Sequence, residues 1–175
     1  MNSPSQSITS THANNTALDT SKLYQEGFVA GTLGAVVVAL WFLILDLIQG
    51  HPLFTPTLLG TALFKGIGAL PAIEKEAVSL EMVAGFTFVH WLVFVILGCI
   101  ASRLLGMVER NSNLGFGILL LFVVFEFGFL AAATVFAKPI IQELTWVTIL
   151  LGNLLAAFGM GWYFWRRHPN MTIYP

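Results

Sequence analysis

Four polar residues stand inside otherwise apolar stretches of this sequence, and their types could do chemistry. They are Asp46, His90, Glu126 and Asn153. A histidine with a carboxylate partner can exchange a proton near neutral pH. A charge near the centre of a bilayer costs about 2.5 to 3.5 kcal/mol on insertion scales, so it seeks a partner there. These residues are therefore candidates for proton transfer, for cation binding, or for a hydrogen-bonded knot that fixes how helices meet.

The spacing of these residues predicts that three of them meet at one depth. His90, Glu126 and Asn153 each lie nine or ten residues from the outer end of a predicted spanning helix. At a rise of 1.5 Å per residue, all three lie roughly 14 Å below that end. We expect direct or water-bridged contact between His90 and Glu126, with Asp46 shallower, at the mouth of the cluster. A structural role for Asn153 and a solvated Asp46 at the interface are the simpler alternatives.

The histidine and carboxylate spacing does not favour a metal or haem site, and we expect no cofactor. A di-iron bundle uses Glu-x-x-His pairs on two helices, and this sequence has no such pair. Haem held by two histidines needs both at depth, and only His90 qualifies. No Ser-His-Asp order or phosphate loop stands out either, so no catalytic residue is predicted.

The elements that must position these residues are four long apolar runs. The chain has 175 residues, of which 57% are hydrophobic and only 10% are charged, against about 25% charged residues in soluble domains. A spanning helix needs about 20 mostly apolar residues. The sequence predicts an all-α bundle of four transmembrane helices, with spans at about 27–48, 82–105, 114–136 and 144–165. A disordered polar tail over 1–26 and a short C-tail over 166–175 flank this domain.

The connection between the first two spans is itself hydrophobic. Thr55 and Pro56 form a good N-cap and first-turn pair, and about ten apolar residues follow. That length is too short to cross a bilayer and suits a helix that lies in the interface or re-enters the membrane. We expect residues 56–65 to form such a helix on the outer side.

The basic residues predict the orientation of the bundle. With four spans, one side of the membrane holds five of them: Lys22, Arg103, Arg110, Arg166 and Arg167. The other side holds three: Lys65, Lys75 and Lys138. The positive-inside rule then places both termini in the cytoplasm.

Small residues at intervals of about four predict the faces on which the helices pack, because close approach in lipid depends on small side chains. The first span carries Gly27, Gly31 and Ala35, the second carries Gly98 and Ser102, and the fourth carries Gly152 and Ala156. We see no repeat that relates the two halves of the chain, so an inverted-repeat transporter is not favoured.

The run Trp41–Asp46, followed by Gly50–Pro56 and by Leu59 and Gly60, resembles small bacterial integral membrane proteins of unknown function. The resemblance covers about a fifth of the chain and implies the bacterial inner membrane, without an activity.

Three functions fit these features, and the first is preferred. It is a non-enzymatic membrane protein that acts as an accessory subunit or helper of a larger membrane complex. The second is a small oligomeric permeation protein for ions, protons or solutes that uses His90 and Glu126. The third is a membrane redox protein or enzyme with a small bound ligand. The expected partners are the lipid bilayer and other membrane subunits or further copies of the chain. A net charge of −1 gives no reason to expect nucleic acid.

Overall fold

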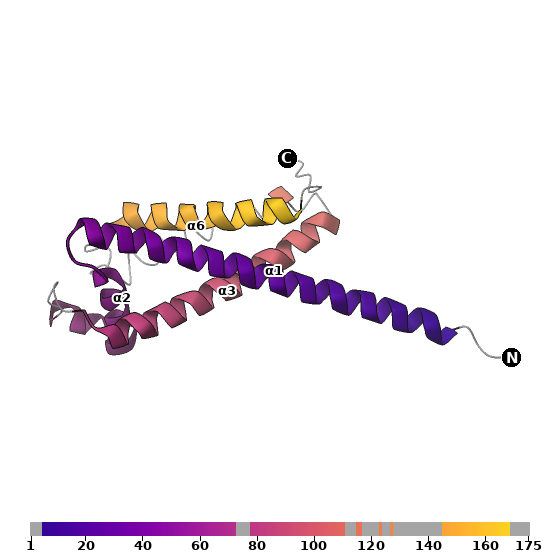
Figure 1. Ribbon diagram of the computed structural model, residues 1–175, viewed down its shortest axis with the longest axis horizontal. Coiled ribbons are helices and arrows are strands. Elements are labelled where there is room, and N and C mark those ends of the chain that lie inside the picture. Colours follow the sequence, from indigo (N-terminus) through magenta and orange to yellow (C-terminus); the bar gives the residue numbers. More distant parts are fainter. Residues whose placement is uncertain are drawn as a thin grey trace.

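The long apolar runs become long helices in the computed structural model of the chain (Figure 1). These elements are α1 (Ser5–Ile48), α2 (Phe54–Lys65), the short 3₁₀ helix η1 (Ile67–Ala72), α3 (Leu80–Arg110) and α6 (Trp146–Arg167). The structure describes residues 5–72, 78–110 and 145–168, together with 115, 116, 123 and 127. Side chains are described for 21–69, 78–108, 145–168 and those four positions.

Three of the described helices are long and apolar enough to cross a membrane. The qualifying segments are Ser21–Ile48, Leu80–Val108 and Trp146–Arg167, which agree with the first, second and fourth predicted spans. The predicted third span, 114–136, lies outside the described residues except for four isolated positions. The α1 backbone is already helical from Ser5, through most of the segment that the sequence predicted to be a disordered tail.

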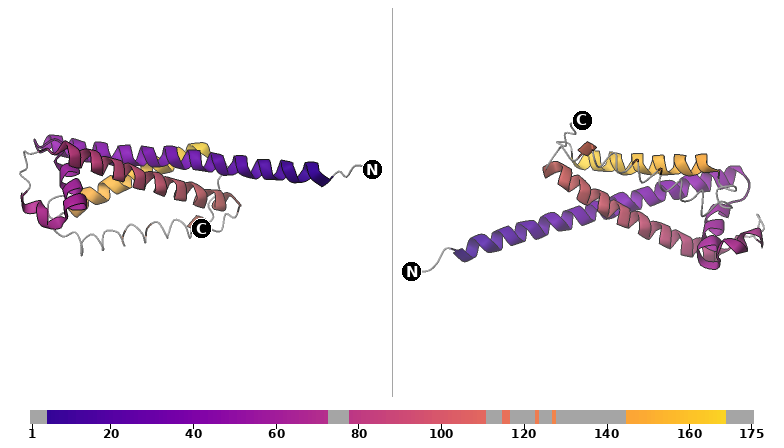
Figure 2. Two further views of the ribbon diagram at one scale, coloured as in Figure 1. Left: turned by 90° about the horizontal axis from the view of Figure 1, so that it is seen from below. Right: turned by 180° about the vertical axis from the view of Figure 1, so that it is seen from behind.

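Helix α1 lies in the middle of the described helices, and α3 and α6 both run opposite to it (Figures 1 and 2). The end of α3 meets the start of the α1 span, where the Ser102 hydroxyl donates to the Leu23 carbonyl at 2.8 Å. The start of α6 meets the other end of α1, where the Trp41 indole N–H donates to the Thr148 carbonyl at 3.0 Å. Helix α3 therefore ends, and α6 begins, at opposite ends of the bundle. The third span over 114–136 stays a prediction.

Glycines allow the backbones of α1 and α3 to come into direct contact where the two helices cross. A Cβ added at Gly27 would lie 2.5 Å from the Cys99 Cα, and one added at Gly31 would clash with the Phe94 carbonyl. From the α3 side, a Cβ at Gly98 would meet the backbone of Gly27 and Gly31. No side chain larger than hydrogen fits at this crossing, so these glycines set the distance between the two helices.

Helix α6 packs on α1 through larger partners. A Cβ at Gly152 would lie 3.0 Å from the Trp41 ring, and one at Gly34 would lie 2.7 Å from the Met160 sulfur. Ala156 is buried on the same side of α6. Small residues on one helix therefore receive bulky side chains from the other.

Helix α2 lies across one end of α1 and α3 (Figure 2), and a Cβ at its Gly60 would meet the Met82 backbone of α3. Its 12 residues extend about 18 Å at 1.5 Å per residue, well short of a bilayer core of about 30 Å. The predicted helix over 56–65 therefore exists and begins two residues earlier. Its interfacial or re-entrant placement in a membrane stays a prediction.

Candidate functional site

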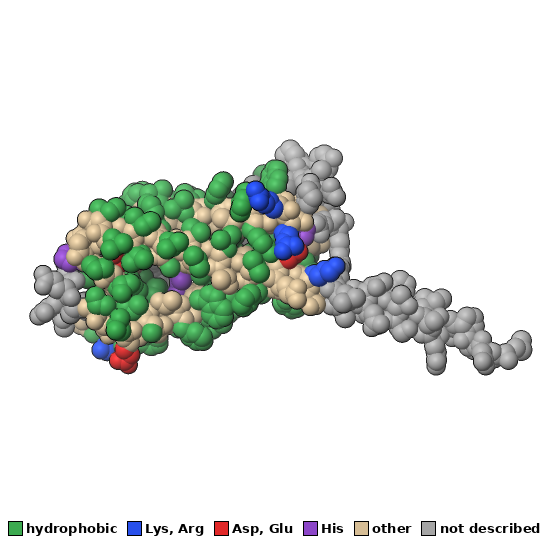
Figure 3. All heavy atoms as spheres, in the orientation of Figure 1, with side chains coloured by type: hydrophobic (Ala, Val, Ile, Leu, Met, Phe, Trp, Pro, Cys, Tyr) green, Lys and Arg blue, Asp and Glu red, His purple; other side chains and the backbone are tan. Residues whose placement is uncertain are grey.

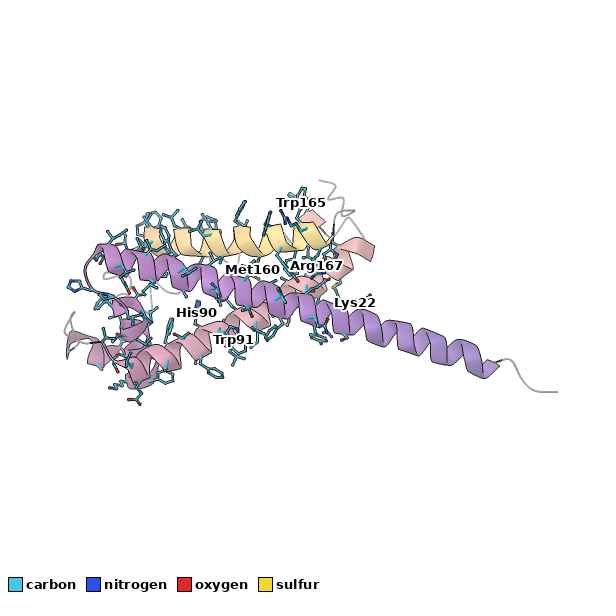
Figure 4. The ribbon with its side chains drawn as sticks, in the orientation of Figure 1. Lys22, His90, Trp91, Met160, Trp165 and Arg167 are labelled. Atoms are coloured by element: carbon cyan, nitrogen blue, oxygen red, sulfur yellow. The ribbon has the colours of Figure 1, made fainter. Side chains whose placement is uncertain are left out.

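His90 projects from α3 toward α1 (Figure 4), where its Nε2 lies 3.3 Å from the Ala35 carbonyl oxygen. A carbonyl can only accept, so Nε2 carries the hydrogen at this contact. The Phe86 and Phe94 rings lie one turn to either side, with centroids 5.6 and 4.8 Å from the imidazole. The imidazole is therefore held between two aromatic rings against the backbone of the neighbouring helix.

Trp91 forms a second contact beside it that the sequence did not predict. Its indole N–H donates to the Thr32 hydroxyl at 3.2 Å, and its ring meets Phe28 edge-on, with centroids 5.8 Å apart. The available signal was the indole itself, because a buried tryptophan N–H needs an acceptor. Two adjacent residues of α3 thus hold α1 at Thr32 and Ala35, one turn apart.

Asp46 is only 3% exposed, so it is not the solvated interfacial carboxylate that was the simpler alternative. Its two carboxylate oxygens accept the Thr55 backbone N–H at 2.8 Å and the Thr55 hydroxyl at 2.6 Å. The first N–H groups of a helix have no partner inside it and favour a negative charge. Asp46 therefore caps α2 from the end of α1.

The prediction that Thr55 is the N-cap of α2 is wrong. The helix begins at Phe54, and its N-cap position is Leu53, which has a left-handed backbone (φ 65°) and makes no side-chain cap hydrogen bond. Thr55 lies inside the first turn and donates to Asp46 rather than capping the helix itself. An acceptor from α1 replaces the local cap that the sequence suggested.

The predicted cluster is spread along the bundle in the described helices. His90 lies beside Ala35, whereas Gly152, the neighbour of Asn153, lies against Trp41. Six residues of α1 separate these levels, about 9 Å at 1.5 Å per residue. Asp46 lies eleven residues beyond Ala35 on α1, roughly 16 Å from it by the same rise. The structure therefore does not bring His90 and Asn153 to one level, whereas Asp46, which the sequence placed shallower, lies nearer the α2 end of the bundle.

The partner expected for His90 is Glu126, which lies outside the described residues, so their contact stays a prediction. Asn153 is half-buried on α6. Within the described part of the chain, no three His, Cys, Asp or Glu residues come together in a way that could hold a metal ion.

The opposite end of the bundle carries a charged and aromatic group, of which the sequence analysis used only the basic residues, to predict orientation. His168 Nε2 lies 3.1 Å from the Glu26 carboxylate, which joins the end of α6 to α1. Arg103 lies over the Tyr24 ring at 5.0 Å, and Arg166 lies over the Trp162 ring at 4.2 Å. Basic side chains gather at this end, whereas apolar side chains cover most of the visible surface (Figure 3).

No protein-family model matches this chain, and no curated protein and no solved structure is significantly similar to it. These comparisons do not support the resemblance of the 41–60 region to small bacterial membrane proteins. Functional inference depends on the residue contacts described above.

Proposed function

We propose that this chain is a non-enzymatic integral membrane protein that acts as an accessory subunit or helper of a larger membrane complex. The observation that carries the proposal is that its polar side chains form hydrogen bonds between helices. Several of them, in the described spans, join one helix to another. In the described part of the chain no buried side-chain nitrogen or oxygen lacks a hydrogen-bond partner.

Each junction of α1 with another described α-helix has a polar side-chain contact. His90 and Trp91 join α3 to α1, Trp41 joins α1 to α6, and Asp46 joins α1 to α2. In four of the hydrogen bonds between helices the partner is a backbone group. These bonds join Trp41 to the Thr148 carbonyl, Asp46 to the Thr55 N–H, His90 to the Ala35 carbonyl, and Ser102 to the Leu23 carbonyl. Polar groups committed in this way stabilise a scaffold, which suits a subunit that presents a surface better than a site that exchanges ligands.

The surface available for a partner includes the face of α6 turned away from α1. An exposed stripe at helical spacing runs along it: Leu151, Leu155, Phe158, Trp162 and Trp165. Phe158 and Trp165 are 75% and 76% exposed. Lipid covers such a face in an isolated bundle, and a second membrane protein can replace that lipid. Large aromatic side chains supply much contact area to such an interface.

The proposed setting is the bacterial inner membrane, with both termini in the cytoplasm. Lys22, Arg103, Arg166 and Arg167 lie at the same end of the helices, because Arg103 lies over Tyr24 and His168 reaches Glu26 at the start of the α1 span. The positive-inside rule favours the cytoplasm for that end. The resemblance noted in the 41–60 region points to the same membrane.

The test is purification of the tagged chain from native membranes in a mild detergent, followed by identification of the proteins that remain bound. We expect a membrane protein at near-equal amount. In the double variant Phe158→Ala/Trp165→Ala, this partner should be lost. The control Phe88→Ala/Ile96→Ala removes two exposed apolar side chains from α3, 60% and 51% exposed, and should retain the partner.

A second measurement separates this proposal from the permeation alternative. The purified chain is reconstituted into vesicles, and proton or cation flux is recorded. We expect no flux above that of empty vesicles. A chain that purifies without any partner and conducts protons would overturn the accessory role, and loss of that flux in Glu126→Gln would then support the His90–Glu126 pathway.

A further inference from the structure

A groove of about 1050 Å³ opens at the basic end of the bundle, on the junction between α1 and α6. Its walls come from the start of the α1 span and the last turns of α6. Its lining includes Lys22, Gln25, Phe28, Val29, Tyr163 and Arg167. A cavity of this size exceeds what a few waters need and falls in the range of small-molecule sites.

The charges of the groove favour an anion. Lys22 and Arg167 approach it from neighbouring helices (Figure 4). The acidic lining residue, Glu26, already has the His168 imidazole at 3.1 Å. The Arg167 guanidinium lies 5.7 Å from the centre of the Tyr163 ring, which is another lining residue. Two cationic side chains thus stand at the rim while the carboxylate is engaged.

The apolar part of the groove continues along the span. Phe28 and Val29 follow Lys22 by about two turns of α1, and both are nearly half-exposed. The ligand that fits is therefore anionic at one end and hydrocarbon at the other. A free nucleotide or a phosphopeptide would leave Phe28 and Val29 uncovered.

We propose that this groove binds one anionic phospholipid, with its phosphate between Lys22 and Arg167 and an acyl chain along Phe28 and Val29. Basic pockets between membrane helices on the cytoplasmic side bind anionic headgroups in this way. Tyr163 and Trp162 on α6 lie at the level where aromatic residues meet the headgroup region. The inference goes beyond the accessory role, because the site belongs to this chain alone and needs no protein partner.

The test is native mass spectrometry of the purified full chain with phosphatidylglycerol and with phosphatidylcholine that carry the same acyl chains. We expect the unaltered chain to retain phosphatidylglycerol preferentially. The double variant Lys22→Gln/Arg167→Gln should weaken phosphatidylglycerol binding roughly 30-fold and leave phosphatidylcholine binding unchanged. The conservative variant Lys22→Arg/Arg167→Lys should keep the preference.

Arg166→Gln is the matched control, since Arg166 lies at the same end, is exposed, and stacks on Trp162, and neither of these two residues lines the groove. It should retain phosphatidylglycerol like the unaltered chain. Equal binding of the two lipids, or an unchanged preference in the Gln double variant, would overturn the proposal. Displacement of the lipid by inorganic phosphate or glycerol phosphate at equal concentration would also overturn it, because the site would then recognise a soluble anion. Each of these results concerns the purified chain, so failure here leaves the co-purification test of the accessory role intact.

Discussion

The Asp46 carboxylate and Thr55 are joined by two short hydrogen bonds, 2.8 Å from the backbone N–H and 2.6 Å from the hydroxyl. The pair closes the sharp connection between α1 and α2, in which Gly50 and Leu53 both have positive φ. The end of one helix thereby supplies the charge that the start of the next requires. The position of α2 across α1 and α3 depends on this pair.

Replacing Asp46 by Ala should lower the free energy of unfolding by about 1 to 2 kcal/mol, because the cap is lost and the Thr55 donors are left buried without an acceptor. Asp46→Asn keeps one acceptor oxygen and should cost less. Thermal unfolding in detergent, followed by circular dichroism, measures both. Glu81→Gln is the control: this carboxylate lies in the first turn of α3 but is exposed, so its loss should cost less than Asp46→Ala. Equal stability of Asp46→Ala and the unaltered chain would contradict the capping role.

Replacing Gly27 by Ala should destabilise the bundle by on the order of 1 to 3 kcal/mol, since the added methyl would meet the Cys99 backbone and push α1 from α3. Gly161→Ala is the matched control: a Cβ there has nothing within 4 Å, and alanine favours a helix over glycine. The same thermal unfolding assay compares them. A Gly27→Ala chain as stable as Gly161→Ala would show that the crossing is looser than described.

The predicted contact between His90 and Glu126 can be measured as a coupling energy. We expect His90→Phe, Glu126→Gln and the double variant to give a coupling of about 0.6 kcal/mol or more, the typical size of a hydrogen bond between membrane helices. His90→Gln should retain an N–H donor to the Ala35 carbonyl and cost less than His90→Phe. Additive effects of the two single changes would show that the residues do not touch.

The predicted topology can be tested by thiol labelling in intact cells, with Cys99→Ala as the background. Single cysteines in Ser5→Cys and Asn170→Cys should both be shielded from an impermeant reagent, and one in Ala77→Cys should be labelled. This pattern follows from the basic residues at one end of the helices. Labelling at both termini would invert the orientation. Labelling at one terminus alone would mean an odd number of spans.

The sequence alone determined which segments form long apolar helices, because each contains a run of about 20 apolar residues. Twenty apolar residues have no stable place in water, and in lipid a helix is what satisfies its own backbone. The spans over 27–48, 82–105 and 144–165 therefore overlap the apolar segments Ser21–Ile48, Leu80–Val108 and Trp146–Arg167, although helix α1 itself begins much earlier, at Ser5. The small residues at Gly27, Gly31 and Gly98 were also visible, because close backbone approach in lipid requires them.

The tertiary structure alone decided what the polar residues contact. His90 meets the Ala35 carbonyl, and every residue has a carbonyl, so no sequence signal marks that partner. Counting residues from helix ends placed His90 and Asn153 at one depth. In the structure His90 and Asn153 lie at different levels along α1. The packing of α3 and α6 against α1 decides how far each helix is displaced along the bundle axis. Asp46 and Thr55 meet only because the chain turns sharply between α1 and α2. That turn depends on the positive φ angles of Gly50 and Leu53, and the residue types allow these angles but do not dictate them.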